Sequence, residues 1–369
     1  MGPTYTIGMS KRIPHFSRMQ DHDYITSLDK VDRTEPYYYS PLSSSQVGKS
    51  DFNRFLSEQG VRARPSYWSR GQCKDIRSVI SLINNSTKIL VILGAGGSVG
   101  PDFRSPGGLY DSIAKAAVLE DPSQVFEIDT FFQDPSIFWR FAHTIFPSEK
   151  PEHSKVHFFI EELQRRGKLL RLYSQNVDTL EVGISPEKLR CVHGSWRENK
   201  CHRCGAVHSI EDIRPHVVSG TVPVCQFCAG PIKPGIVFFG ESTNLNRVEA
   251  EMDAMEADLL LVIGTSLRVA PISEFPKYMP NIPSILINRT VIDCQFSARL
   301  LGECSDIIDY IEAELGWDDD SNILVNQIQN YQPNIFIFPS NSPLASRVVQ
   351  NPRSDFLVTS VPCDVADLM

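Results

Sequence analysis

The chain has 369 residues, of which 41% are hydrophobic, 22% charged and 9% aromatic. This composition is that of an ordinary globular protein and excludes a collagen-like, coiled-coil or wholly disordered chain. The net charge of −8 is not the strongly basic balance typical of nucleic-acid binding, so we expect no direct contact with nucleic acid. The longest apolar run, Ile89 to Leu93, is far shorter than the roughly 20 residues of a membrane span. With no signal peptide at the start, an intracellular protein without membrane attachment is expected.

The first 70 residues are polar and interrupted by prolines, and they show no sustained helical or strand period. We predict a largely disordered N-terminal extension over residues 1–70. Apolar residues then recur with alternating helix and strand character through the middle of the chain. The predicted helices lie near residues 76–83, 157–164, 248–257 and 307–315, and the predicted strands at 88–93, 169–173, 259–263 and 285–287.

Near-continuous apolar strands separated by helices predict an α/β fold: a Rossmann-like parallel sheet with helices on both faces. We expect this domain to cover residues 71–317. A cysteine-containing stretch interrupts its pattern and predicts a small inserted module over residues 195–232. Residues 318–369 begin with three aspartates and are rich in Asn, Gln, Ser and Pro. They are predicted to form a flexible C-terminal tail, although the apolar residues 335–338 could dock elsewhere.

Two matched cysteine pairs lie inside the predicted module. Each pair has the spacing Cys-x2-Cys, and 20 residues separate them. Two such knuckles supply four thiolates to one tetrahedral zinc ion, and four sulfur ligands leave no open position for a substrate. The sequence therefore predicts one structural zinc ion in a zinc-ribbon module, bound by Cys201, Cys204, Cys225 and Cys228.

A glycine-rich turn, Gly94-Ala95-Gly96, directly follows the first predicted strand. In a doubly wound fold this is where the chain leaves the sheet and meets a phosphate, because glycines let the backbone come close to it. The strict Gly-x-Gly-x-x-Gly pattern is absent, since Val99 occupies its last position. From the turn alone, a nucleotide loop and an ordinary strand-end turn remain equal alternatives.

Further motifs follow the glycine turn in a fixed order. They are Pro101-Asp102-Phe103-Arg104, Gln175-Asn176-Val177-Asp178, His193-Gly194-Ser195, the two cysteine pairs, Lys233 to Glu241, Gly264-Thr265-Ser266 and Ile287-Asn288-Arg289. This ordered set resembles the sirtuins, the NAD-dependent protein-lysine deacylases, over about residues 73–317. The residues of these motifs are most similar to those of the class I, silent-information-regulator branch. That branch implies a nuclear location, with the cytoplasm as the alternative, and partners among chromatin-silencing complex subunits.

The resemblance implies roles for individual residues. His193 would be the general base, a task suited to an imidazole whose pKa lies near 6.5. Asn176 and Asp178 would complete the catalytic set, although residues of these types after a strand are more often helix caps. An extended substrate peptide would pair along Val237, Phe238 and Phe239. The implied NAD-binding residues are Gly94, Ala95, Gly96, Ser98, Asp102, Phe103, Arg104, Gln175, Asn176, Val177, Asp178, Gly264, Thr265, Ser266, Asn288, Arg289 and Cys304.

One segment departs from the family pattern. Only Val99 and Gly100 stand between Ser98 and Pro101, which makes the cofactor loop three residues shorter, and Gly97 replaces a usually larger residue. The other positions of the pattern are intact. The resemblance therefore implies an NAD-dependent deacetylase acting on acetyl-lysine in histone tails, with nicotinamide and O-acetyl-ADP-ribose as products and a role in chromatin silencing.

Three alternatives to this function remain open. The first is a catalytically impaired chromatin-binding protein, because the loop is short. The second is a protein ADP-ribosyltransferase, because both reactions begin by breaking the same bond of NAD. The third is an oxidoreductase, which is disfavoured because no acidic residue sits convincingly at the ribose position expected about 20 residues beyond the glycines, and because it leaves the zinc module and the His-Gly-Ser motif unexplained.

Overall fold

The residues whose structure is described begin at Cys73. The predicted N-terminal extension lies outside them. Among the described helices, none is both long and apolar enough to cross a bilayer. The computed structural model describes residues 73–98, 113, 121–148, 152–279, 282–292, 294–317, 327–332 and 334–339.

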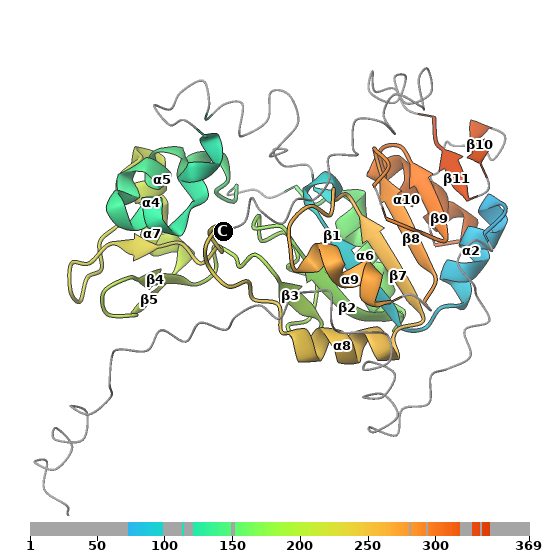
Figure 1. Cartoon of the computed structure of the whole chain (residues 1–369), viewed down its shortest axis with the longest axis horizontal. Helices are drawn as coiled ribbons and strands as arrows, with labels where there is room; N and C mark the ends of the chain where they lie inside the picture. Colours follow the sequence, from blue (N-terminus) through green and yellow to red (C-terminus); the bar gives the residue numbers. More distant parts are fainter. Residues whose placement is uncertain are drawn as a thin grey trace, which may run out of the picture. The chain divides into compact units, whose positions relative to one another are not determined.

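An eight-stranded sheet carries the larger part of the fold (Figure 1). Its strands lie in the order β10-β11-β9-β8-β7-β1-β2-β3, and every neighbouring pair is parallel except β10 with β11. The strands of this sheet are β1 (Ile89–Leu93), β2 (Leu169–Ser174), β3 (Leu189–Cys191), β7 (Leu259–Ile263), β8 (Ser284–Asn288), β9 (Ala298–Leu301), β10 (Gln329–Gln332) and β11 (Ile335–Ile337).

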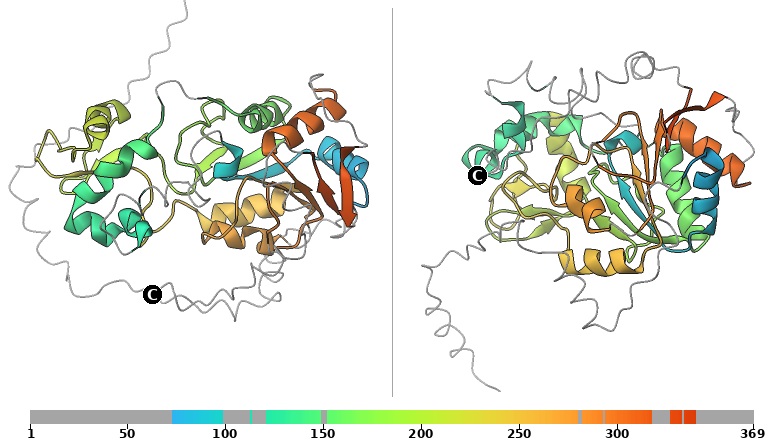
Figure 2. Two further views of the ribbon diagram at one scale, coloured as in Figure 1. Left: turned by 90° about the horizontal axis from the view of Figure 1, so that it is seen from above. Right: turned by 45° about the vertical axis from the view of Figure 1, so that its right-hand side comes forward.

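Helices cover both faces of this sheet, because its central strands are apolar on both sides. In β1, Ile89, Val91 and Leu93 pack in the same core as α2, α6 and α10, whereas Leu90 and Ile92 pack with α8 and α9. Figure 2 (left) shows α6 in green and α8 in gold on opposite sides of the strands. This confirms the predicted fold class. The covering helices are α2 (Ile76–Asn85), α6 (Lys155–Arg165), α8 (Arg247–Glu256), α9 (Phe275–Tyr278) and α10 (Cys304–Glu314).

A second core belongs to the cysteine-containing module. Its antiparallel sheet has the order β5-β4-β6. The indole of Trp196 packs 6.1 Å from that of Trp139 and donates a hydrogen bond to the carbonyl of Ile145 at 3.1 Å. The zinc-ribbon strands therefore share a core with a helical segment that the prediction of 195–232 left out. The module contains α4 (Ile128–Gln133), α5 (Pro135–Phe141), β4 (Asn199–Cys201), β5 (Val207–His208), α7 (Ile210–Ser219) and β6 (Ile232–Lys233).

The C-terminal region corrects one prediction. Strand β11 pairs in parallel with β9, and the next residue, Phe338, donates its N–H to the carbonyl of Leu301 at 2.8 Å. Its ring is buried against Tyr310 of α10, with 5.4 Å between ring centroids. Residues 329–332 therefore form a strand where a flexible tail was predicted, and the apolar run 335–338 docks on the sheet, an outcome that the sequence left open. The boundaries at residues 70 and 317 stay predictions.

Candidate active site

The glycine turn after β1 lies directly against the turn after β7. Gly94 N donates to Ile263 O at 2.9 Å, and Gly96 N donates to Gly264 O at 2.7 Å. A Cβ on Gly94 would lie 2.5 Å from the Cβ of Thr265, and one on Gly264 would lie 2.1 Å from Gly97 N. Only glycine allows this approach. Both turns stand at the carboxyl edge of the parallel strands, where ligands bind in open α/β sheets.

The segment after β2 joins these two turns through its side chains. Gln175 N donates to Leu93 O at 2.9 Å, and Thr265 Oγ1 donates to Gln175 Oε1 at 3.2 Å. Asn176 Nδ2 lies 3.3 Å from Gly94 O and 2.9 Å from Ser98 Oγ. Residues that are far apart in the chain, at the ends of β1, β2 and β7, thus form one polar cluster.

His193 follows β3 and completes this cluster. Its Nδ1 lies 2.9 Å from the carbonyl of Gln175. Because a carbonyl only accepts, Nδ1 carries the proton and Nε2 is left with a free lone pair. Burial lowers the pKa of His193 below 6.5, and the bond to Gln175 opposes this effect more weakly. The ring is therefore neutral at pH 7 and able to accept a proton at Nε2.

Three buried polar atoms of this cluster have no hydrogen-bond partner among the described residues. They are Gln175 Nε2, Asn176 Oδ1 and His193 Nε2. A native interior satisfies nearly all such groups, so unpartnered atoms gathered at a sheet edge point to a polar ligand. One donor beside two acceptors suits hydroxyl groups, which both donate and accept. The donor set therefore fits the ribose of a dinucleotide.

Asp178 takes part in the backbone of the same segment. Its Oδ1 accepts a hydrogen bond from Leu180 N at 3.2 Å, which is the capping geometry that its residue type favours. Val177 packs at the edge of the module core. Within the described residues, these contacts give Asp178 a structural task, and its catalytic role stays a prediction.

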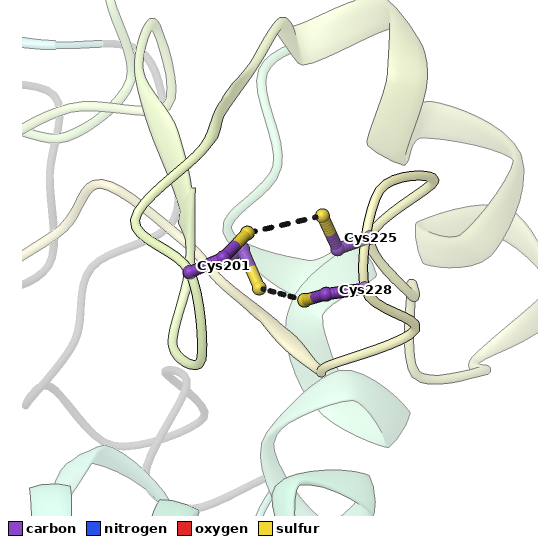
Figure 3. Close-up of side chains that lie close together, drawn as sticks. Cys201, Cys225 and Cys228 are labelled. Atoms are coloured by element: carbon purple, nitrogen blue, oxygen red, sulfur yellow. Dashed lines mark hydrogen bonds between the residues drawn. The ribbon is translucent and has the colours of Figure 1, made fainter. Parts of the chain in front are cut away.

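The four cysteines of the module converge on one point. Their sulfur atoms all lie within 4.8 Å of one another, with Cys201 3.4 Å from Cys228 and Cys204 3.6 Å from Cys225. Figure 3 shows the thiols of Cys201, Cys225 and Cys228 directed at one another. Four thiolates at this spacing bind one tetrahedral zinc ion and leave no open position, so the predicted structural site is confirmed in its geometry.

Tight turns bring the two pairs together. Gly205 N donates to Cys201 O at 2.9 Å, and Ala229 N donates to Cys225 O at 2.8 Å. Gly205 has φ +72° and Ala229 has φ +55°, so each knuckle turns through the left-handed region. A Cβ on Gly230 would lie 3.1 Å from Cys201 Sγ. The glycine after the second pair is therefore needed for the close approach of the two knuckles.

Comparison with known proteins shows which family has a similar sequence. Residues 94–271 match the family model described as "Sir2 family". The chain is 38% identical over 274 residues to the NAD-dependent protein deacetylase HST1 of Saccharomyces cerevisiae, covering 64% of this chain and 54% of that protein. Residues 94–271 of this chain form a Sir2 (sirtuin) family domain.

Other relatives agree with this assignment. The sirtuin is 39% identical over 258 residues to the NAD-dependent histone deacetylase SIR2 of Candida albicans, covering 65% of this chain and 49% of the relative. It is 39% identical over 314 residues to the NAD-dependent deacetylase sir2D of Dictyostelium discoideum, covering 81% and 57%. A solved structure described as "Structural Basis for the Mechanism and Regulation of Sir2 Enzymes" matches with TM-score 0.58 and 27% identity, over 66% of this chain and 98% of the other. The chain spans about half the length of these curated relatives.

Three further residues that are predicted to bind NAD, Asn288, Arg289 and Cys304, lie at the same sheet edge. Asn288 ends β8, and its Nδ2 donates to Thr290 O at 2.9 Å. Arg289 pairs with Glu303 at 2.8 Å, and Cys304 begins α10 with its thiol buried. Burial raises the pKa of Cys304 to about 12 and keeps the thiol protonated. Only backbone groups of Cys304 are therefore suited to polar recognition.

Of the other residues that are predicted to bind NAD, Ala95 and Ser266 are described by the structure and three are not. Ser266 is exposed, whereas Ala95 is partly buried beside the glycine turn. The predicted nicotinamide-side residues, Asp102, Phe103 and Arg104, lie outside the described residues. Their roles stay predictions from the sequence.

All three backbone N–H groups of the predicted peptide-binding segment, residues 237–239, already donate hydrogen bonds within the protein. Val237 N donates to His193 O at 2.8 Å, Phe238 N to Glu241 Oε2 at 2.7 Å, and Phe239 N to Phe126 O at 2.7 Å. A peptide could therefore add here only by donating to carbonyl groups. Strand addition stays a prediction.

The side chain of Phe238 lies in the module core. It is 1% exposed and packs edge-on against Phe131 at 5.4 Å. A contact of Phe238 with a substrate peptide stays a prediction. Alternation along the extended segment directs Phe238 into the core, whereas Phe239 is 41% exposed and remains available to a substrate.

One pair of residues near the site was missed from the sequence. Ser154 and His157 form a reciprocal capping box at the start of α6, and Ser154 also contacts the glycine turn. The usual signature is Ser or Thr followed three residues later by Glu or Gln. Here His157 occupies the position of the Glu or Gln, so the usual signature is absent from the sequence.

Proposed function

We propose that this sirtuin removes acetyl groups from lysine side chains of proteins in an NAD-dependent reaction. The observation that carries the proposal is the group of three buried, unpartnered polar atoms on Gln175, Asn176 and His193. They stand at the carboxyl edge of the sheet, beside two glycine turns that approach each other closely. The relatives from Saccharomyces cerevisiae, Candida albicans and Dictyostelium discoideum are named NAD-dependent deacetylases.

The residues of the site have distinct tasks in this reaction. When bound, NAD supplies an anomeric carbon with nicotinamide as its leaving group, which the acetyl oxygen of the substrate can displace. Gln175 Nε2 would donate to the ribose of bound NAD, and Asn176 Oδ1 would accept from it. His193 Nε2 would accept a proton from a ribose hydroxyl, because the Gln175 carbonyl fixes the Nδ1–H tautomer. The glycine turns let backbone amides approach the phosphates.

Zinc has no direct part in this chemistry. Four thiolates fill the tetrahedral shell, so the ion offers no position for water or for the acetyl oxygen. The task of the ion is to hold the knuckles together. Activation of the amide therefore falls to the cofactor and to the residues at the sheet edge.

For the substrate we propose acetylated histone tails, with chromatin-silencing subunits as partners and the nucleus as the location. The relatives from Candida albicans and Saccharomyces cerevisiae are named histone deacetylases. The net charge of −8 is compatible with a basic partner. Nucleic acid and membrane are not among the proposed partners.

One observation favours a second candidate function. The segment between Ser98 and Pro101 is three residues shorter than the family pattern, and a loop that closes poorly over NAD would leave a protein that binds acetyl-lysine without turning it over. ADP-ribosyl transfer to protein is a further outcome that the same assay detects.

The deciding experiment is a mass-spectrometric assay of the zinc-loaded chain with acetylated histone H3 and H4 peptides, with and without NAD. We expect loss of the acetyl group and release of nicotinamide only when NAD is present. His193→Tyr should reduce the rate by about a hundredfold or more, because general bases contribute that much.

A variant with three residues inserted after Val99 distinguishes the candidates. If the parent chain is inactive and this variant is active, the short loop is the defect and the binding function is favoured. No nicotinamide release by either protein would contradict the proposed reaction. Mass added to protein in place of acetyl loss would show ADP-ribosyl transfer.

A further inference from the structure

The first turn of α6 is tied to the glycine turn by a buried hydrogen bond. Ser154 Oγ donates to the carbonyl of Gly97 at 2.5 Å, and Ser154 is only 5% exposed. Ser154 is the N-cap of α6, a helix that packs on the sheet face and lies far from the turn in sequence. This bond therefore joins the covering helix layer to the predicted cofactor loop.

His157 completes the capping box beside that bond. Ser154 N donates to His157 Nδ1 at 3.2 Å, and Ser154 Oγ lies 2.9 Å from the same nitrogen. A hydroxyl has one proton, which Gly97 O receives, so Nδ1 serves as acceptor for the backbone N–H of Ser154. Burial lowers the pKa of His157 to about 4, and the neutral ring keeps Nδ1 able to accept.

Gly97 packs closely against the core at this contact. A Cβ there would lie 2.5 Å from Leu93 Cδ1 and 3.3 Å from Val156 Cγ1, and both side chains are fully buried. A larger residue at position 97 would therefore require the Leu93 side chain or α6 to shift.

The hydrogen bond from Ser154 to Gly97 affects the candidate site through the next residue, Ser98. Ser98 Oγ accepts from Asn176 Nδ2 at 2.9 Å, and that bond leaves Asn176 Oδ1 as the unpartnered acceptor. If Gly97 were released, Ser98 would lose its fixed place and Asn176 its orientation.

We propose that Ser154 and His157 are positioning residues for NAD binding, acting through Gly97, Ser98 and Asn176. This inference rests on the proposed function, because NAD is the ligand that the positioned atoms would bind. A freed turn has to be ordered again when the ligand binds, and ordering backbone costs free energy. The loss should appear in NAD affinity more than in the rate of the bound complex.

The test uses the full zinc-loaded chain with the substitutions Ser154→Ala, Ser154→Thr, His157→Leu and His157→Gln. Ser154→Ala and His157→Leu should raise the KM for NAD about threefold to tenfold, the effect of one buried hydrogen bond, with kcat changed less than about twofold. Ser154→Thr keeps the hydroxyl and His157→Gln keeps a capping acceptor. These two variants should stay near the parent value.

Ser209→Ala provides a matched control. Ser209 caps α7 in the same reciprocal way, with Asp212 as its partner at 2.8 and 3.2 Å, and α7 packs in the module core, away from the glycine turn. Its substitution removes a helix cap only. Hydrogen exchange of the backbone amides of residues 94–98 should be faster in Ser154→Ala and unchanged in Ser209→Ala.

The outcomes separate this inference from the proposed function. If the parent chain does not deacetylate, the proposed function is wrong, and amide exchange together with calorimetric titration of NAD still decides the inference. Faster exchange with weaker NAD binding in Ser154→Ala supports it. Parent-like exchange and affinity in Ser154→Ala, an equal effect of Ser209→Ala, or a parent chain that binds no NAD would overturn it.

Discussion

At the scale of single residues, His193 shows how burial and one carbonyl prepare a base. The hydrogen bond from Nδ1 to Gln175 O selects the tautomer, and burial holds the ring neutral. The His-Gly-Ser motif was sufficient to single out His193 in the sequence. The sequence could not show that Gln175 supplies the carbonyl, because that contact joins two residues 18 positions apart that follow different strands.

The lowered pKa of His193 predicts a pH dependence. Burial destabilises the imidazolium, so the neutral base form persists as the pH falls through 6.5, the ordinary value. We expect kcat/KM for the acetylated peptide to stay level from pH 8 to pH 6.5 and to fall only at lower pH. Steady-state rates across this range test the prediction. An acid limb with its midpoint at or above pH 6.5 would contradict it.

At the scale of elements, the strands that the sequence predicted well are long, apolar and central. Strands β1 and β7 are buried at every position, and their composition alone identifies them. Strand β11 is only three residues long and stands within a polar tail. Its apolar residues predicted docking somewhere. They did not predict where, because the choice of β9 as partner depends on an edge that exists only in the folded sheet.

Strand β11 predicts a stability contribution from the C-terminal region. Phe338 is 1% exposed beside Tyr310 and follows the paired strand. We expect Phe338→Ala to lower the free energy of unfolding by about 3 kcal/mol or more, as for other large buried aromatic residues. Denaturant unfolding measures this change. Tyr331→Ala, on the 40% exposed side chain of β10, is the control and should cost less than about 0.5 kcal/mol. Equal effects would contradict the docked position of β11.

At the scale of the whole domain, the zinc module and the candidate site depend on each other through one segment. Val237 N binds the carbonyl of His193, and Phe239 N binds that of Phe126 in the module core. Movement of the module would therefore shift the segment that faces the predicted peptide. A zinc ion without catalytic contact can in this way control activity.

Removal of zinc should inactivate the protein without touching its chemistry. Because structural zinc supplies folding free energy to its module, we expect chelation or Cys228→Ser to remove about nine-tenths of the deacetylase activity and to lower the melting temperature. Refilling with Co²⁺ should restore activity and give the absorption of a tetrahedral thiolate site. Cys294→Ser, outside the cluster, is the control. Full activity and unchanged melting of the metal-free chain would contradict the prediction.

The sequence by itself determined the parallel α/β fold and the four zinc ligands, because these depend on local apolar runs and fixed spacings along the chain. The residues of the polar cluster were named through the resemblance to the sirtuins. Only the tertiary structure decided which atoms of the cluster remain unpartnered, that Phe238 faces the core, and that Ser154 holds Gly97. Each of these depends on the close approach of segments that are distant in the chain, and packing in three dimensions fixes that approach.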